Sequence, residues 1–447
     1  MNFEVIKKAL LDALKENGVE NYEIYYMSSG ETSVETLNNE INSFASGNTG
    51  GICVRLSVDG KMGYASGELM SENEMANLVS RAIENAKYTE KEDTVGIFAG
   101  SESYEKTNCP KFVPYETAKL KALASDIANK IYKTSDKVQN GTSSAAMSFE
   151  FSVRLINSFG LDLENHCGVN AAMAQSVVCE NGVFDSAFSF KECKEDLDVQ
   201  KMAEDSVNDA LEKIGAASVE TGKYNTVISG KQMRSILSAF SPAFSSKNAQ
   251  LGMSLLAGKE GCKVASDTVT ITDDPMREGV SIQTYFDAEG VAAHRKNIVE
   301  NGVLNTLLYN RETALKAGKE STGNASKGSY ESPVGISPYA LCIEAGEYSL
   351  DQLFEIAGDG VYITEVKGLH AGANAITGDF SIESAGFLIK NGKNAEPIKS
   401  FTIAGNFFEL LKSIHALSNE VEMGVPTGFT TFGSPAVLIK DMSVAGK

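Results

Sequence analysis

Tight-turn dipeptides recur along the chain between segments of alternating polar and apolar residues, and they constrain the fold more than any other feature. Asn-Gly and Asp-Gly pairs favour two-residue hairpins, because both central positions of such a turn need a positive φ. Candidates stand at residues 59–60, 140–141, 181–182, 301–302, 359–360 and 391–392. Hairpins of this kind join neighbouring antiparallel strands. The pattern therefore predicts a protein rich in antiparallel sheet.

Helical segments between these strands suggest three units and a linker. Residues 1–87 have the order helix, strands, helix, and a capping box at residues 71–74 opens the second helix. After a linker over residues 88–114, residues 115–220 repeat that order. Residues 221–447 contain strands and turns. The shorter helices inserted among them are expected near residues 230–253 (apart from Pro242), 311–317, 351–357 and 406–416.

The fold class follows from this order of elements. We expect an α+β protein, in which N-terminal α+β units pack their helices on an antiparallel sheet. A large, mostly antiparallel and β-rich C-terminal domain with inserted helices should follow. We also expect the oligomer contact on this C-terminal domain, because it should offer more strand edges that need a cover.

Composition excludes several classes of function. The 447 residues are 42% hydrophobic and 22% charged, as in ordinary globular proteins. No apolar run approaches the 18 or so residues of a membrane-spanning helix. The 40 Lys and Arg against 59 Asp and Glu give a net charge of −19, a poor match for nucleic-acid phosphates. We therefore expect neither membrane insertion nor direct nucleic-acid binding.

Cysteine usage and the N-terminus indicate the compartment. The seven cysteines include no CxxC pair, so neither a zinc ribbon nor a redox motif is present. The first residues, MNFEVIKKALLDALKENG, are typical of an amphipathic helix and lack the features of a signal peptide. Both observations favour a cytoplasmic protein.

The familiar catalytic motifs are missing. No two of the four histidines lie within one helical turn, so HExxH and HExxxH are both absent. Phosphate-binding loops, dinucleotide fingerprints and the GxSxG nucleophile elbow are absent as well. Carboxylates stand in turns at residues 273–274, 287 and 289. Such groups mostly cap backbone amides, and the alternative is cation ligation or substrate contact.

One glycine-rich segment, residues 368–381, combines small and polar residues as binding loops do. Its glycines allow close backbone approach, and its polar side chains could hydrogen-bond the main chain of a peptide. The alternative is a structural corner with capping side chains, and a polar turn at residues 320–324 leaves the same choice. The candidate peptide-binding residues are Gly368, His370, Gly372, Asn374, Gly378 and Asp379.

Long ordered segments also carry a resemblance to a known family. They include residues 226–256, residues 285–325, residues 363–392 and the C-terminal SPAVLIKDMSVAGK. With these segments the chain resembles the TldD/PmbA family, formerly called modulators of DNA gyrase, and within it the PmbA (TldE) branch. The resemblance spans nearly the whole chain. It implies a cytoplasmic system in which a TldD-type subunit binds zinc through HExxxH and a C-terminal cysteine. The resemblance also implies that the TldD-type subunit, together with a PmbA-type subunit, cleaves unfolded peptides, including peptide precursors and labile antitoxins.

The zinc ligands of the family do not carry over to this chain. In the register of the resemblance, Ser238 and Ala243 stand where the two histidines would be, and Ala239 replaces the glutamate. Alanine has no metal-binding atom, and Pro242 would disturb the helix that aims both ligands. No cysteine follows Cys342. The resemblance therefore implies no cofactor in this chain and a zinc ion in a TldD-type partner.

The leading hypothesis is a non-catalytic subunit of a TldD/PmbA-type peptidase, which leaves open whether the chain is itself an enzyme. Its partners would be a TldD-type homologue in a heterodimer, or a second copy in a homodimer, and an unfolded peptide substrate. One alternative is a peptidase with an unrecognised site near His370, Asn374 and Asp379. The other is a regulator that contacts DNA gyrase as a protein.

Overall fold

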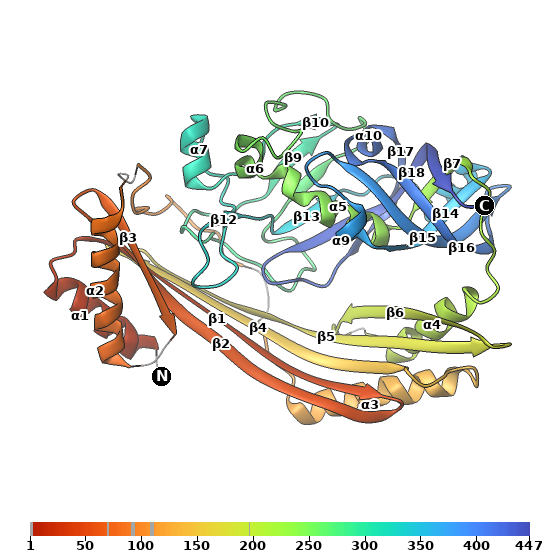
Figure 1. Ribbon diagram of the computed structural model, residues 1–447, viewed down its shortest axis with the longest axis horizontal. Helices are drawn as coiled ribbons and strands as arrows, with labels where there is room; N and C mark the ends of the chain where they lie inside the picture. Colours follow the sequence, from red (N-terminus) through yellow and green to blue (C-terminus); the bar gives the residue numbers. More distant parts are fainter. Residues whose placement is uncertain (1–2, 69–70, 91–93, 108–110, 196) are drawn as a thin grey trace.

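The protein consists of a long curved sheet and a C-terminal lobe that sits on the inner face of that sheet (Figure 1). The computed structural model describes residues 3–68, 71–90, 94–107, 111–195 and 197–447. The predicted α+β class, with a β-rich C-terminal lobe, is confirmed. No helix in these described ranges is long and apolar enough to cross a membrane.

A six-stranded antiparallel sheet makes up the N-terminal half, in the order β3-β2-β1-β4-β5-β6. The strands are β1 (Asn21–Leu37), β2 (Glu40–Val58), β3 (Lys61–Glu68), β4 (Ser143–Asn157), β5 (Asp162–Glu180) and β6 (Val183–Glu192). Strands β1 and β4 pair at the centre, from Glu23 with Asn157 to Leu37 with Ser143. The units expected at 1–87 and 115–220 therefore share one continuous sheet, while the domain boundaries themselves stay a prediction.

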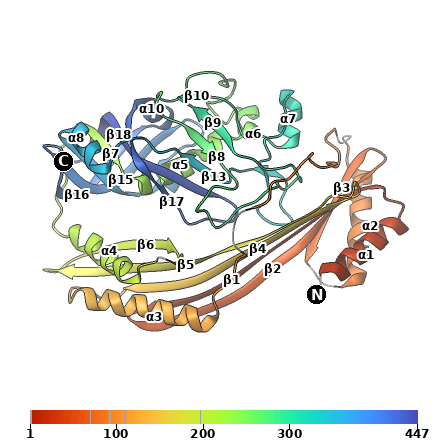
Figure 2. The ribbon, with the colours of Figure 1, turned by 180° about the vertical axis from the view of Figure 1, so that it is seen from behind.

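Four helices cover the outer face of this sheet. They are α1 (Phe3–Glu16), α2 (Glu72–Tyr88), α3 (Thr117–Thr134) and α4 (Val199–Glu212). The first two lie at one end of the sheet and the last two at the other end (Figure 2). Ser71 is the N-cap of α2, as predicted, because its hydroxyl accepts the Glu74 backbone N–H. The Glu74 carboxylate accepts the Ser71 hydroxyl, whereas in the predicted capping box it would accept the Ser71 backbone N–H.

Alternation along β1 divides its side chains between the two faces of the sheet. Ile24 packs in the core under α1 and α2, and Val34 packs under α3. Because successive strand residues point to opposite faces, Tyr25, Met27 and Ser29 point to the inner face, toward the C-terminal lobe.

The C-terminal lobe is built on a ten-stranded mixed sheet, whose main path runs β10-β9-β8-β13-β18-β16-β15-β14-β7. The strands are β7 (Gly222–Ile228), β8 (Ile271–Asp273), β9 (Lys296–Glu300), β10 (Val303–Leu304), β13 (Ala340–Ile343), β14 (Gly360–Lys367), β15 (Asp379–Lys390), β16 (Lys393–Asn406), β17 (Ile414–Met423) and β18 (Thr431–Ala445), beside the small pair β11 (Ala325–Ser326) and β12 (Gly335–Ile336). Strand β18 pairs with both β16 and β7, so β7, β14, β15, β16 and β18 close into a ring.

Short helices fill the rest of this lobe: α5 (Gly230–Phe240), η1 (Ser241–Phe244), α6 (Ser246–Gln250), α7 (Arg311–Ala317), α8 (Leu350–Ala357), α9 (Leu369–Gly372) and α10 (Phe407–Ser413). Helix α5 packs along β18, and its Phe240 ring stacks on Phe407 at 4.6 Å between centroids. Both rings belong to the largest apolar core of the protein.

Most of the predicted hairpin turns are confirmed, and two are wrong. Residues 59–60, 181–182, 301–302 and 391–392 join adjacent antiparallel strands with positive φ at both positions. Residues 140–141 instead lead from α3 into β4, and 359–360 lead from α8 into β14. Gly360 serves close packing there, because a Cβ would lie 2.0 Å from the Asn225 carbonyl oxygen.

Residues 91–93 and 108–110 of the predicted linker 88–114 lie outside the described residues. Residues 94–107 form neither helix nor strand. They are nevertheless tied to the lobe, because the Tyr104 hydroxyl donates to the Gly290 carbonyl at 2.7 Å and Ser101 Oγ accepts the Ala292 N–H at 2.9 Å.

Candidate functional site

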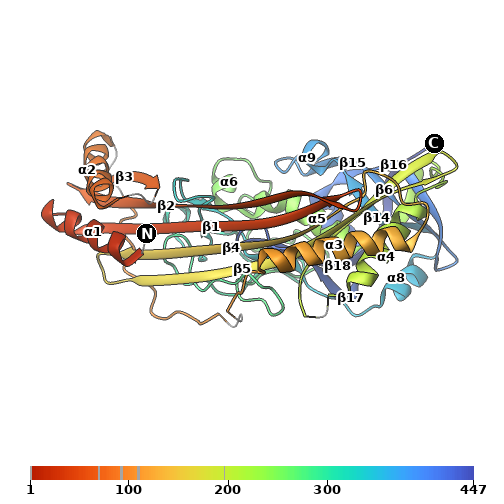
Figure 3. The ribbon, with the colours of Figure 1, turned by 90° about the horizontal axis from the view of Figure 1, so that it is seen from below.

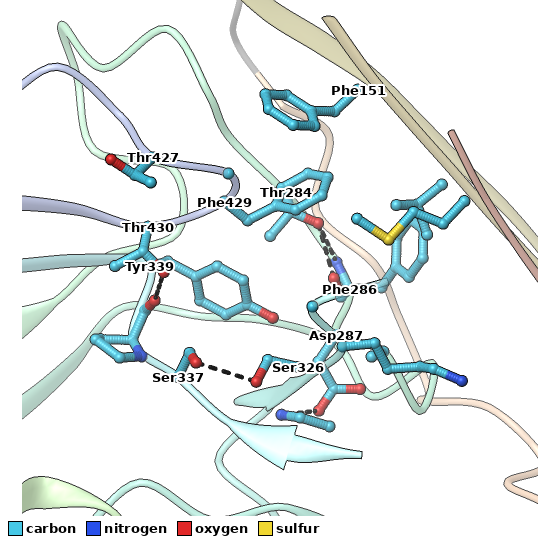
Figure 4. A pocket seen from close by; sticks show the side chains of 18 of the residues that line it. Phe151, Thr284, Phe286, Asp287, Ser326, Ser337, Tyr339, Thr427, Phe429 and Thr430 are labelled. Atoms are coloured by element: carbon cyan, nitrogen blue, oxygen red, sulfur yellow. Dashed lines mark hydrogen bonds between the residues drawn. The ribbon is translucent and has the colours of Figure 1, made fainter. Parts of the chain in front are cut away.

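A cavity of about 290 Å³ lies between the inner face of the sheet and loops of the C-terminal lobe (Figure 4). We call it the interlobe cavity. The sheet contributes Tyr25, Met27 and Ser29 from β1, and Phe151 and Val153 from β4. The lobe contributes residues 284, 286–288, 325–328, 337–339 and 427–430.

Aromatic rings from both sides form the walls of the interlobe cavity. Phe151 on β4 meets Phe429, which lies just before β18, with ring centroids 5.8 Å apart. Tyr339 presents its ring between them and the segment that holds Phe286 (Figure 4). Apolar walls with a few polar groups are typical of ligand-binding cavities.

Asp287 forms the polar end of the cavity and is buried. One carboxylate oxygen accepts the backbone N–H groups of Glu289 and Val291, each at 2.9 Å, and the other accepts that of Ala325 at 3.0 Å. Asp287 therefore caps backbone amides, as expected of carboxylates in turns. Burial, together with the neighbouring Glu289, raises the pKa of Asp287 to about 8.

Tyr339 carries an unusual buried hydroxyl. Its backbone N–H donates to Asp273 at 2.7 Å, but its Oη is buried without a hydrogen-bond partner. Burial, together with the nearby carboxyl groups of Asp287 and Asp273, raises the pKa of this phenol. A buried polar atom without a hydrogen-bond partner destabilises a fold. The packing of the ring therefore does not explain why this position has a tyrosine rather than a phenylalanine.

A buried ion pair supports the segment that leads to Tyr339. Lys296 Nζ lies 3.3 Å from a carboxylate oxygen of Asp273, and Asn324 donates to the same oxygen at 2.7 Å. Lys296 also donates to the side-chain Oδ1 of Asn324 at 3.0 Å. The predicted polar turn 320–324 thus places Asn324 in a network that holds adjacent loops together, rather than in the cavity.

Two larger cavities adjoin the interlobe cavity. One of about 650 Å³ shares Ser29, Phe151, Thr427 and Gly428 with it, and reaches residues 45–49 of β2. Another of about 800 Å³ lies on the other side of Lys327, between β2, β3, α6, α7 and residues 331–334. We call the three cavities together the interlobe trench. Strands of the six-stranded sheet contribute lining residues to all three cavities of the trench.

Buried charges hold the two sides of the trench together. Arg55 on β2 pairs with Glu23 on β1 at 3.4 Å, and both are nearly buried. Arg55 and Arg311 of α7 both donate to the Gly96 carbonyl oxygen, at 3.2 and 2.8 Å, and Arg311 also donates to that of Val95 at 2.6 Å. The sheet, the linker and the C-terminal lobe meet at this point.

The candidate segment 368–381 lies on the C-terminal lobe, and none of its residues lines the three cavities of the trench. His370 is exposed on α9. The Asn374 side chain caps the backbone amides of Ile376 and Thr377, and Asp379 accepts a hydrogen bond from Asn406 at 2.9 Å.

The three glycines of this segment also serve its local shape. Gly368 and Gly378 have positive φ angles of 78° and 83°. A Cβ at Gly372 would lie 2.3 Å from the Ser381 carbonyl oxygen. These contacts are those of a structural corner, and a peptide-binding role for the segment stays a prediction.

The two positions at which the zinc-binding histidines of the family would stand, Ser238 and Ala243, cannot form a zinc site. Ser238 lies in the last turn of α5, which ends at Phe240, while Ala243 lies buried in the 3-10 helix beyond Pro242. Their side chains offer one hydroxyl and a methyl group, which do not fit the nitrogen and sulfur ligands of zinc. Across the described ranges, no three His, Cys, Asp or Glu side chains come together in a way that could hold a metal ion.

Several residues of the interlobe cavity carry no recognisable signal in the sequence. Tyr25, Tyr339 and Phe429 come from segments far apart in the chain, and only the fold brings them together. Phe151 is the exception, because the alternation in SFEFSVRL places it on one face of β4 with Phe149 and Val153.

Comparisons with known proteins agree with this architecture. The family of the PmbA/TldA metallopeptidase C-terminal domain matches residues 221–446, and PmbA/TldA metallopeptidase domain 1 matches residues 22–86. An uncharacterized protein of Methanocaldococcus jannaschii is 33% identical over 90% of this chain and 92% of its own length. Metalloprotease PmbA of Escherichia coli O157:H7 is 25% identical over 93% of this chain and 90% of its own length.

A solved structure extends the likeness to the whole fold. The protein from Thermotoga maritima named as a modulator of a DNA gyrase is 27% identical, with a TM-score of 0.88. The match covers 99% of this chain and 100% of that chain. The matched C-terminal domain spans half of the chain, and the archaeal relative is similar over most of both lengths. The chain therefore belongs to the PmbA/TldD metallopeptidase family.

Proposed function

We propose that this chain is a PmbA/TldE-type subunit that does not cleave peptides itself, but supports cleavage of unfolded peptides by a zinc-bearing TldD-type partner. The observation that carries the proposal is the state of the α5 region. Ser238, Ala239 and Ala243 provide neither two imidazoles nor a carboxylate. A metallopeptidase needs a metal-bound water and a base that takes its proton, and these residues can supply neither.

The interlobe trench gives this subunit a task in peptide handling. Its central part has walls of aromatic rings, and Asp287 and Lys327 lie along it as polar contacts. An unfolded peptide can place apolar side chains against Phe151 and Phe429 while its main chain follows the sheet. The trench would thus hold extended chain near the active site of the partner.

The direct test is a reconstitution. The chain, an HExxxH homologue from the same genome and their mixture are each assayed with a quenched fluorescent unfolded peptide. The mixture should cleave the peptide, a zinc chelator should stop it, and this chain alone should be inactive. Chelator-sensitive turnover by this chain alone would contradict the proposal.

A substitution in the trench tests the role of the subunit inside the mixture. Phe429→Ala should raise the apparent KM by about threefold to tenfold, the worth of one aromatic contact. Phe184→Ala is the matched control, because Phe184 is exposed on β6 and does not line the trench. Equal KM values for the two variants would show that the trench does not bind the peptide.

A further inference from the structure

Strand β2 has a long edge that no other strand covers. On one side β2 pairs with β1 along nearly its whole length. On the other side it pairs with β3 only from Gly51 to Val58. Among the described residues, no strand pairs with the outer side of residues 40–50, and residues 40–49 are all exposed. Figure 3 shows this part of β2 along the margin of the sheet.

The usual protections of a strand edge are missing from this segment. Native edges are commonly blocked by lysine, proline, bulges or a covering loop. Residues 40–50, EINSFASGNTG, contain no lysine and no proline. One bulge interrupts the pairing near the start of the segment, where Asn42 of β2 is an extra residue between Ile41, opposite Thr36, and Ser43, opposite Glu35, and residues 43–50 then follow in regular register. The unpaired N–H and C=O groups beyond it remain available to another extended backbone.

The charge around this edge indicates what kind of chain it accepts. From Glu16 to Val54 the sequence has several glutamates and no lysine or arginine. Glu31 and Glu35 are exposed, and as members of the odd-numbered row of β1 they point to the inner face of the sheet. A second copy paired at this edge would bring the same glutamates together, whereas a cationic chain would neutralise them.

The residues between the edge and these glutamates leave room for long side chains. Glu31 is opposite Gly47 on β2, and Glu35 is opposite Ser43, with Ala45 between the two pairs. An added strand would lie about 4.8 Å beyond β2 and about twice that distance from β1. A lysine or arginine side chain can cross the small residues and reach Glu31. The same stretch lines the 650 Å³ cavity under the loop at residues 426–428.

We propose that the outer edge of β2, from Glu40 to Gly50, binds a cationic extended peptide as an additional strand, with Glu31 and Glu35 contacting its basic side chains. This inference rests on the proposed function in one respect: the proposed function supplies an unfolded peptide as substrate, and the inference names the chemical class of that peptide. Binding itself needs no partner and is measured on this chain alone.

The test uses a fluorescein-labelled short peptide of alternating lysine and serine and measures its fluorescence anisotropy with the purified chain. Two probes of the same length isolate the two contributions. The first has glutamate for lysine, and it should not bind. The second keeps every lysine but is N-methylated at every second amide, and it should bind at least about tenfold more weakly, because one edge of its backbone can no longer donate.

Three variants locate the site. Glu31→Gln and Glu35→Gln should each weaken binding by about twofold to fivefold, as exposed ion pairs do, and high salt should reduce the difference. Ala45→Lys places a repelling charge on the edge and should weaken binding further. Glu84→Gln on α2 is the matched control, because Glu84 is exposed on the outer face and should leave binding unchanged.

Each contrary result overturns the inference. Equal binding of the methylated peptide would mean that charge alone attracts it, without strand addition. Unchanged binding by the Glu31, Glu35 and Ala45 variants would place the peptide elsewhere. Self-association that Ala45→Lys abolishes, with no peptide bound, would assign the edge to a second copy. Peptide binding without cleavage in the mixture would refute only the proposed function, and cleavage without binding at this edge would refute only this inference.

Discussion

Removing the hydroxyl of Tyr339 should make the protein more stable. Its Oη is buried and has no hydrogen-bond partner in the described structure. Tyr339→Phe keeps the ring and its contacts in the cavity wall but deletes the unsatisfied atom. Leaving such a group buried costs about 1–3 kcal/mol, so the free energy of unfolding should rise by about that amount.

Tyr309→Phe is the matched control, because it should change the free energy of unfolding in the opposite direction. Tyr309 is also a buried residue, but its Oη lies 3.2 Å from both carboxylate oxygens of Glu260. Tyr309→Phe removes a hydrogen bond to a charged group, so it should lower the unfolding free energy by about 1–2 kcal/mol. The free energies of unfolding of the two variants should therefore differ by about 2–5 kcal/mol. Because both variants carry the same tyrosine-to-phenylalanine change, the general effect of that change cancels in the difference.

Urea unfolding followed by circular dichroism measures both variants. The comparison needs similar m-values, because a changed m-value would mean that the variants unfold to a different extent. A Tyr339→Phe variant that is less stable than the wild type by 1 kcal/mol or more would refute the reasoning. Such a result would mean that the hydroxyl makes a hydrogen bond in solution and that the ring is held by it.

Three further predictions concern charge, metal and the glycine-rich segment. Because Asp287 has a pKa raised to about 8, the folded state binds more protons than the unfolded state between about pH 4 and 8, and the contribution of Asp287 to stability falls as pH rises through this range. Urea titrations at several pH values should show this slope in the wild type and a flatter one in Asp287→Asn, and parallel slopes would contradict it. Elemental analysis of the purified chain should find no stoichiometric zinc, and one tightly bound zinc lost on mutating His370 or His294 would overturn the non-catalytic assignment. His370→Ala should change the unfolding free energy by less than about 0.5 kcal/mol, because His370 is exposed. A raised apparent KM of this variant in the mixture would support the peptide-binding hypothesis for the segment 368–381. An unchanged KM would mean that the segment is a structural corner.

Local signals in the sequence predicted local structure well. Helix α7 was expected near residues 311–317 and is found there, because Asn310 and Thr313 form a capping box at its start and Gly318, with φ of 64°, ends it. Asn181–Gly182 formed the expected hairpin because both residues take positive φ in the turn. In each case the determining contacts lie within a few residues of the signal.

Contacts between distant segments were not predictable in the same way. Strands β1 and β4 pair over their whole shared length although roughly a hundred residues separate them, and nothing in either segment specifies that register. The oligomer contact was expected on the C-terminal domain because of its strand edges. Five strands of that domain close into a ring, and a longer exposed edge lies on β2, while the position of the oligomer contact stays a prediction.

The linker shows most clearly why composition could not reveal the site. Residues 88–114 are predicted to be a linker because they lack any apolar periodicity. In the structure, their backbone carbonyl groups accept hydrogen bonds from both sides of the trench: Arg55 from the sheet and Arg311 from the C-terminal lobe meet at Gly96. Backbone carbonyls are the same in every residue type, so no sequence pattern marks this role.

This junction has a consequence for how the trench works. Breaking a buried, hydrogen-bonded charge pair by removing one partner costs about 3–5 kcal/mol, because the remaining charge stays buried without compensation. Arg55 is buried beside Glu23 and also holds the linker, so the sheet cannot move away from the C-terminal lobe without exposing or orphaning these groups. The width of the trench is therefore set before any peptide arrives. Under the proposed function, such a trench would select extended chains by shape and by main-chain hydrogen bonding, while the glutamates near the β2 edge would add a preference for basic side chains.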